Sequence, residues 1–160
     1  MTWTVVLGNP EAQQPKVGTP PSPQAKEQMT HGKAVRVLVV DDEPSICKAL
    51  TMALSRGGYE AIAAQSGESA LAIIRNEHVD VMLIDLRIPD MRGDVIFEVA
   101  AGTQPQLRYQ TLFMTGDITD RAHKLIAACK CHFLRKPFDL RDMTDAVAAL
   151  APQQTQDAAG

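Results

Sequence analysis

The chain has 160 residues, 45% of them hydrophobic and 22% charged, which is ordinary for a single globular domain. Sixteen Lys and Arg against nineteen Asp and Glu give a formal net charge of −3, which excludes a strongly basic nucleic-acid-binding chain. No apolar run reaches the ~18 residues of a membrane span, and the start lacks the basic region of a signal peptide. Three cysteines without scaffold spacing predict reduced thiols, and we expect a cytoplasmic protein without membrane insertion.

The two ends of the chain differ in composition from its middle. Residues 1–33 hold five of the ten prolines and predict an extended linker, because proline fixes φ and lacks an amide donor. Residues 151–160 show no apolar periodicity and predict a flexible tail. The folded unit is therefore predicted over 34–150.

Between these ends, short apolar runs alternate with amphipathic helical patterns. The first run is rich in β-branched residues, as expected of a strand buried on both faces. Pro44 suits the first turn of a helix, and Ser66 and Asp139 suit N-caps. In chain order we predict strand 35–40, helix 44–56, strand 59–63, helix 67–76, strand 79–84, helix 94–101, strand 111–114, helix 119–129, strand 131–134 and helix 139–150.

Five strands that alternate with five helices predict an α/β fold. The expected architecture is a parallel sheet with helices on both faces and right-handed crossovers. In such sheets, ligands bind beyond the carboxyl ends of the strands, where the strand order reverses. The residues that follow each strand are therefore the candidates for a site.

Polar side chains follow four of the predicted strands. Asp41 and Asp42 follow the first, Asp85 the third, Thr115 the fourth and Lys136 the fifth. Neighbouring carboxylates stay ionised only beside a cation, and open sites of oxygen ligands favour Mg²⁺. The Thr hydroxyl and the Lys ammonium could each hold a phosphoryl oxygen. Taken alone, the aspartate pair at the first strand could instead cap the helix that follows it.

Four strings in this order carry a resemblance to a known family. They are LVVDDEP at 38–44, LIDLRIPDMRG at 83–93, MTGD at 114–117 and FLRKPF at 133–138. Together they resemble the CheY-like receiver domain of two-component response regulators, over about 35–150. The resemblance implies a flavodoxin-like (βα)5 fold with strand order 2-1-3-4-5.

The resemblance also implies a phosphorelay function. By it, Asp85 is the phosphoacceptor and takes a phosphoryl group from a phosphohistidine on a histidine kinase or a histidine phosphotransfer domain. Mg²⁺ is then held by the carboxylates of Asp41, Asp42 and Asp85 and by the backbone carbonyl of Arg87. No independent multiple-turnover activity is expected beyond this transfer and the loss of the phosphoryl group.

Three further residues receive switch or catalytic roles from the resemblance. Lys136 and Thr115 assist at the phosphoryl group, and Thr115 also acts as the switch hydroxyl. Phe133 takes the position of the switch aromatic. The surface formed by the last two helices and the last strand is expected to repack, and it is also the surface of a weak homodimer. We further hypothesise that Arg87 and Asp117 pair beside the acyl phosphate and slow its hydrolysis.

The setting of the domain is left open by the sequence. Residues 2–7 resemble the last strand of a histidine kinase ATP-binding domain, so the chain is either a stand-alone regulator or a module of a hybrid histidine kinase. Because only ten residues follow Leu150, we expect no direct nucleic-acid binding. A phosphate-dependent hydrolase is a remote third class. Zinc at Cys129 and Cys131 is disfavoured, since their spacing is not that of a zinc ligand pair.

Overall fold

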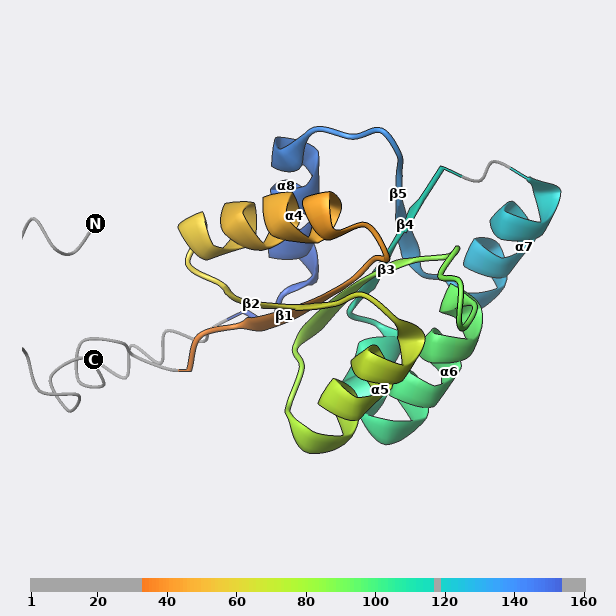
Figure 1. Ribbon diagram of the computed structural model, residues 1–160, viewed down its shortest axis with the longest axis horizontal. Coiled ribbons are helices and arrows are strands. Elements are labelled where there is room, and N and C mark those ends of the chain that lie inside the picture. The colour runs from red at the N-terminus through yellow and green to blue at the C-terminus, as the bar shows by residue number, and fades with distance from the viewer. Residues whose placement is uncertain (1–32, 117–118, 154–160) are drawn as a thin grey trace, which may run out of the picture. The chain divides into compact units, whose positions relative to one another are not determined.

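The computed structural model describes residues 33–116 and 119–153 (Figure 1). The predicted segment 2–7, nearly all of the predicted linker, Asp117 and most of the predicted tail lie outside the described residues. The described residues form one parallel sheet in the order β2-β1-β3-β4-β5, which confirms the fold class and the strand order. Its strands are β1 (Arg36–Val40), β2 (Glu60–Ala64), β3 (Val81–Asp85), β4 (Thr111–Thr115) and β5 (His132–Arg135).

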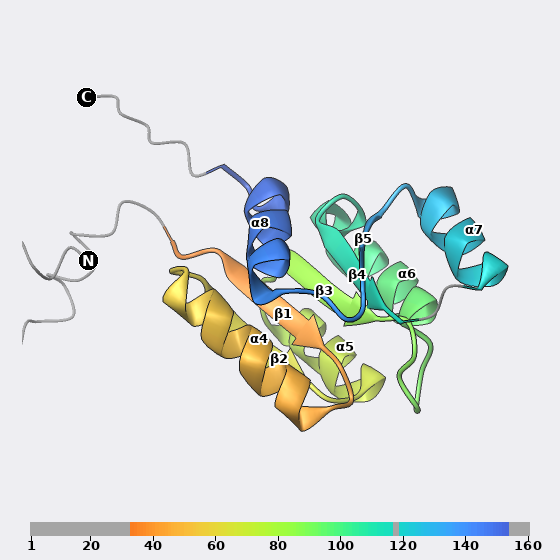
Figure 2. The same cartoon turned by 90° about the horizontal axis from the view of Figure 1, so that it is seen from above.

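Helices cover both faces of this sheet. The helices are α4 (Pro44–Arg56), α5 (Gly67–Asn76), α6 (Gly93–Thr103), α7 (Asp120–Cys129) and α8 (Leu140–Leu150), with a short 3₁₀ helix η2 (Pro105–Arg108). One apolar core lies between the sheet and α4 and α8, and a second lies between the sheet and α5, α6 and α7. Figures 1 and 2 show α4 and α8 together on one face, with α5 and α6 on the other.

The central strands are buried on both faces, as their continuous apolar runs predict. All five residues of β3 are buried, and so are four of the five in β1. Burying one such Val, Leu or Ile side chain contributes about 1.5–3 kcal/mol. Packing on both faces therefore holds β1 and β3 in place, and with them the residues at their carboxyl ends.

Two features differ from the sequence prediction. The helix predicted over 94–101 runs from Gly93 to Thr103, because neither Gly93 nor Gly102 interrupts it. The 3₁₀ helix Pro105–Arg108, which begins with Pro at its first turn, was not predicted. The other predicted elements are present within one or two residues at each end.

One aspartate ties the loop after β3 to the start of α5. Asp90 accepts hydrogen bonds from the backbone amides of Gly67, at 2.9 Å, and Glu68, at 3.0 Å, while Ser66 caps the same helix through Ser69 at 3.1 Å. These amide donors hold the pKa of the Asp90 carboxyl below its ordinary value. The loop that follows Asp85 is thereby anchored to a neighbouring helix.

Asp90→Asn is expected to lower the melting temperature at neutral pH. A lowered carboxyl pKa stabilises the fold above the unfolded value of 3.8 and loses that effect as the pH falls through the folded pKa. The difference from the unsubstituted protein should therefore disappear in acid. Calorimetry from pH 7 to pH 3, with exposed Asp145→Asn as control, measures it, and a pH-independent difference would contradict this account.

Candidate functional site

The parallel register brings three strand ends together at one edge of the sheet. Val40, the residue before Asp41, pairs with Ile84, the residue before Asp85. On the other side of β3, Asp85 pairs with Met114, the residue before Thr115. The side chain of Asp85 is thus placed between the acidic loop after β1 and the hydroxyl at the end of β4.

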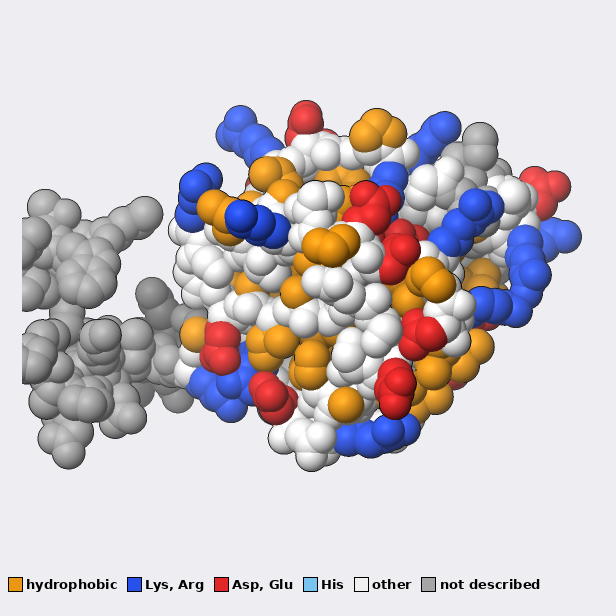
Figure 3. Space-filling view, viewed as in Figure 1, with side chains coloured by type: hydrophobic (Ala, Val, Ile, Leu, Met, Phe, Trp, Pro, Cys, Tyr) orange, Lys and Arg blue, Asp and Glu red, His pale blue; other side chains and the backbone are white. Residues whose placement is uncertain are grey.

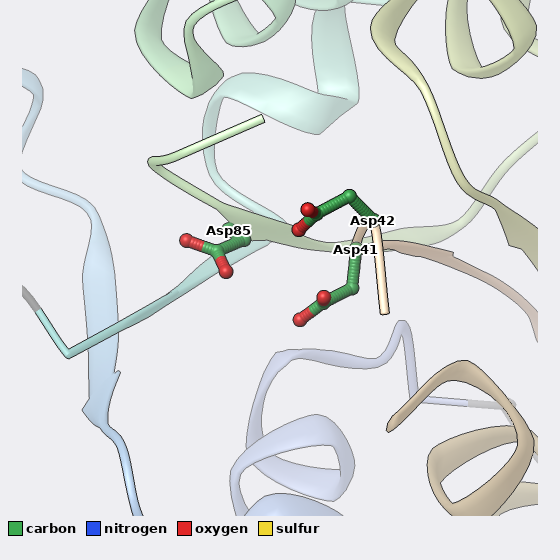
Figure 4. Close-up of side chains that lie close together, drawn as sticks. All are labelled: Asp41, Asp42 and Asp85. Atoms are coloured by element: carbon green, nitrogen blue, oxygen red, sulfur yellow. The ribbon is translucent and has the colours of Figure 1, made fainter. Parts of the chain in front are cut away.

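Three carboxylates meet at this edge. Oxygens of Asp41, Asp42 and Asp85 lie within 4.8 Å of one another, and Figure 4 shows the side chains around one shared space. Asp41 is fully buried and Asp85 is 8% exposed, whereas Asp42 is open to solvent. Among the described residues, this is the one group of His, Cys, Asp and Glu with the spacing of a metal site.

A lysine spans two of the carboxylates. Lys136 Nζ donates to Asp41 Oδ2 at 2.6 Å and to Asp85 Oδ2 at 2.7 Å, and its side chain is 19% exposed. Burial lowers the pKa of this ammonium, but its bonds to the two carboxylates outweigh burial, so the pKa is raised. Lys136 is therefore a fixed cation between Asp41 and Asp85.

Backbone amides donate hydrogen bonds to the other oxygen of each of these two carboxylates. Glu43 N donates to Asp41 Oδ1 at 3.0 Å, and Arg87 N donates to Asp85 Oδ1 at 2.9 Å. The N-cap of α4 is Glu43, not Asp41 or Asp42, and no side chain caps this helix end. The capping alternative for the aspartate pair is therefore wrong.

A glycine at the start of α6 lies against the backbone of the site. A Cβ on Gly93 would lie 2.5 Å from the carbonyl oxygen of Asp85 and 2.8 Å from Leu86 Cα. Such contacts with backbone atoms do not occur between real atoms, so no larger residue fits without moving the end of β3. The sequence placed this glycine in a motif but did not show this contact.

The predicted switch residues Thr115 and Phe133 differ in burial. Thr115 is buried at the end of β4, and Lys136 N donates to its carbonyl at 2.8 Å. Phe133 is 46% exposed and meets His123 of α7 edge to face, with ring centroids 6.4 Å apart. The Arg87–Asp117 pair remains a prediction, since Asp117 lies outside the described residues.

The turn from α7 into β5 places a lysine in an unusual backbone conformation. Lys130 lies in the left-handed region at φ 55°, a conformation that usually favours glycine or asparagine. The flanking Cys129 and Cys131 are partly buried against the core beside α6. Neither belongs to a candidate metal group among the described residues.

Comparison with known families agrees with this fold. Residues 37–148 match the model of the response regulator receiver domain, so the chain belongs to that family. It contains the receiver domain of a two-component response regulator. None of the helices in the described residues has the length and apolarity needed to cross a membrane.

Curated relatives are longer than this chain. The probable transcriptional regulatory protein TcrX of Mycobacterium tuberculosis is 33% identical over 119 residues, which are 74% of this chain and 50% of the relative. The transcriptional regulatory protein GlrR of Escherichia coli is 34% identical over 114 residues, 69% of this chain and 24% of the relative. The chain thus spans between a quarter and a half of these relatives.

Solved receiver structures have the same fold over nearly their full length. A CheY-like receiver domain protein from Methanospirillum hungatei has a TM-score of 0.69 and 26% identity, covering 73% of this chain and 93% of that one. The chemotaxis protein CheY4 of Vibrio cholerae has a TM-score of 0.67 and 26% identity, covering 74% and 99%.

Proposed function

We propose that Asp85 accepts a phosphoryl group from a phosphohistidine on a histidine kinase or a histidine phosphotransfer domain. The observation that carries the proposal is the position of Asp85 at the end of the central strand. Its carboxylate adjoins Asp41 and Asp42 on one side, is bonded to Lys136 at 2.7 Å, and lies beside the β4 strand end that carries Thr115. Neither of the other two carboxylates follows a strand that pairs with β4.

The donor set fits a magnesium ion. Three carboxylates face one lysine, so the cluster retains negative charge, and oxygen ligands beside open solvent suit Mg²⁺. The ligands would be Asp41, Asp42, Asp85 and the backbone carbonyl of Arg87. When bound, the ion would neutralise the cluster and polarise the phosphoryl oxygens.

The residues of the chain supply the rest of the chemistry. In the transfer, a carboxylate oxygen of Asp85 forms a bond to phosphorus as the phosphorus–nitrogen bond of the donor histidine breaks, and the imidazole leaves with that electron pair. Such transfer depends on positioning and charge neutralisation. Lys136 and the Thr115 hydroxyl would bind phosphoryl oxygens, and movement of Thr115 would draw Phe133 inward.

The proposed output surface comprises α7, β5 and α8. Phe133 is half-exposed in the described structure, so a movement toward the core would bury more of its ring. The expected repacking would bias a two-state equilibrium through the charge added at Asp85. We also propose that two copies of the chain form a weak homodimer through this surface.

The relatives bear on the kind of protein in which this receiver domain works. We expected no direct nucleic-acid binding. The relatives are named as transcriptional regulatory proteins, and this does not support that expectation. They also give no support to a hybrid kinase, and the kinase-like segment 2–7 lies outside the described residues. A receiver within a response regulator is the reading that the comparisons favour.

The proposal is tested by mass spectrometry after incubation with acetyl phosphate and Mg²⁺. One phosphoryl group is expected per chain, on the peptide that contains Asp85, and none on Asp85→Asn. The control Asp145→Asn, an exposed change on α8, should be labelled normally. Labelling of Asp85→Asn at the rate of the unsubstituted protein would overturn the assignment.

Mg²⁺ is expected to raise the melting temperature through the same cluster. A ligand at a hundred times its dissociation constant stabilises the folded state by about 2.7 kcal/mol. Asp42→Asn keeps the buried Asp41 and Asp85 but removes the exposed carboxylate, so most of this gain should disappear. Equal stabilisation of Asp42→Asn and the unsubstituted protein would place the ion elsewhere.

A further inference from the structure

Two cysteines meet at the turn from α7 into β5. Cys129 is the last residue of α7, and Cys131 lies directly before β5. Both are free thiols, and both are only partly buried. Burial, and after it a hydrogen bond between the two thiols, raises the pKa of Cys131. The two side chains are therefore in contact in the reduced protein.

The backbone between the two cysteines has the geometry that a disulfide requires. Lys130 lies in the left-handed region, at φ 55° and ψ 31°. Left-handed and right-handed helical dihedrals are mirror images, so the Cα atoms on either side of such a residue lie about 5.4 Å apart, as they do in an α-helix. Disulfides join Cα atoms that are most often about 5.5–6 Å apart, whereas an extended middle residue would separate them by roughly 7 Å. The turn thus places the two cysteines within reach of one another.

Hydrogen bonds hold this turn in place. Lys130 N donates to the carbonyl of Ala127 and Cys131 N to that of Ile126, each at 3.3 Å, which satisfies the last carbonyls of α7. Cys129 Sγ donates to the carbonyl of Ile126 at 3.3 Å, and Cys131 Sγ donates to that of Cys129 at 3.5 Å. Because the reduced thiols are already positioned, little conformational order has to be created for them to react together.

A small reagent can reach one of the two thiols. Cys129 lines a hollow of about 620 Å³ between α6 and α7, which is ample for a peroxide molecule. Figure 3 shows exposed apolar side chains over α6 beside the basic side chains of α7. Cys47, in contrast, is 3% exposed, and its Sγ donates to the Asp41 carbonyl at 3.1 Å. Oxidation is therefore expected at Cys129 and Cys131 and not at Cys47.

The pair is suited to oxidation rather than to a metal. Among the residues that the structure describes, no His, Asp or Glu completes a metal group with Cys129 and Cys131. Paired thiols are instead oxidised to a disulfide through a sulfenic acid. We propose that Cys129 and Cys131 form a modification site, which a peroxide oxidises to a reversible disulfide.

The oxidation takes two steps. Cys129 Sγ attacks one oxygen of hydrogen peroxide, the oxygen–oxygen bond breaks, and the leaving hydroxide takes up the thiol proton as water. Cys131 Sγ then attacks the sulfenic sulfur, the sulfur–oxygen bond breaks, and the hydroxide leaves with the Cys131 proton as a second water. The two sulfurs together lose the two electrons that the peroxide gains. Because the disulfide is partly exposed, dithiothreitol should reduce it again.

Mass spectrometry of the full chain with hydrogen peroxide tests the site. The mass should fall by one pair of hydrogen atoms, on the peptide that contains Cys129 and Cys131, and should return with dithiothreitol. Cys131→Ser should instead leave a sulfenic acid on Cys129, which dimedone labels. Cys47→Ala should form the disulfide at a nearly unchanged rate. Thiols that stay reduced, a disulfide that includes Cys47, or a link between two chains would overturn the proposal.

A matched pair of variants tests the role of the backbone. Lys130→Gly and Lys130→Val both remove the charge, but only the β-branched valine disfavours a positive φ. Lys130→Gly should form the disulfide at least as fast as the unsubstituted protein, and Lys130→Val several-fold more slowly. Equal rates in the two variants would contradict the positioning of the thiols by the left-handed turn.

The disulfide also bears on the proposed output surface, because Phe133 follows Cys131 by two residues. A closed disulfide fixes the turn and with it the direction in which β5 leaves α7. This effect rests on the function proposed above, whereas the oxidation itself does not. Acetyl phosphate and Mg²⁺ should move the Phe133 amide signal several-fold less in the oxidised than in the reduced protein, and equal shifts would contradict the link. Absence of any label on Asp85 in the reduced protein would overturn the proposed function and leave the oxidation test standing.

Discussion

Lys136→Met is expected to lower the free energy of unfolding by about 2–4 kcal/mol at neutral pH, because removing one partner of a buried ion pair strands the other charge. Lys136 Nζ bonds to both Asp41 and Asp85, and Asp41 is fully buried. Met has a similar length and no charge, so the change tests the cation rather than the packing. Urea unfolding without Mg²⁺ measures the loss.

Two further variants separate this charge effect from a general loss of fold. Lys136→Met combined with Asp85→Asn removes one stranded carboxylate, so it should recover part of the lost stability. Lys48→Met changes an exposed lysine on α4 and should alter stability by well under about 1 kcal/mol. Equal effects at Lys136 and Lys48, or no recovery in the double variant, would contradict the argument.

The pH dependence follows from the raised pKa of Lys136. A group with a raised folded pKa gives its full stabilisation below the unfolded value, here 10.5, and loses it as the pH rises through the folded pKa. The deficit of Lys136→Met should therefore be constant from pH 6 to pH 9 and shrink only in strong alkali. The same variant should slow phosphorylation of Asp85 roughly a hundredfold or more, since a preorganised cation at the phosphoryl group is lost.

The sequence predicted the fold and the convergence of the cluster for a simple physical reason. Parallel strands end at one edge, so the residues that follow them, Asp41, Asp85 and Lys136 among them, were expected at that edge of the sheet. The strand order, in contrast, followed from the family resemblance, because periodicity does not distinguish neighbouring strands. Lys136 bonds to Asp85, 51 residues earlier in the chain, and to Asp41, 95 residues earlier. No rule of sequence spacing gives the geometry of these two bonds.

The features that the sequence missed depend on close tertiary contacts. Asp90 reads as an ordinary turn residue until the amides of Gly67 and Glu68 are seen to donate to it. Nothing in the chain order shows that Arg92 and Arg121, which come from separate segments, line one hollow. Local propensity describes an element by itself, whereas these contacts arise where two elements meet.

Gly93→Ala is expected to destabilise the domain by at least about 2 kcal/mol, since forcing extra atoms into a packed site strains the backbone. The added Cβ would lie 2.5 Å from the Asp85 carbonyl oxygen and 2.8 Å from Leu86 Cα, and backbone cannot give way as a side chain can. Relief requires α6 and the end of β3 to separate. Displacing Asp85 should therefore also slow its phosphorylation roughly tenfold or more.

The same helix supplies a matched control. Gly102 also lies in α6, but a Cβ there would meet nothing within 4 Å, so Gly102→Ala should stabilise the domain by up to about 1 kcal/mol through helix propensity. Thermal unfolding and acetyl phosphate labelling of both variants give the comparison. Opposite signs of stability change, with slow labelling only in Gly93→Ala, would show that the close approach of α6 to Asp85 holds the phosphoacceptor in place, and equal changes would exclude it.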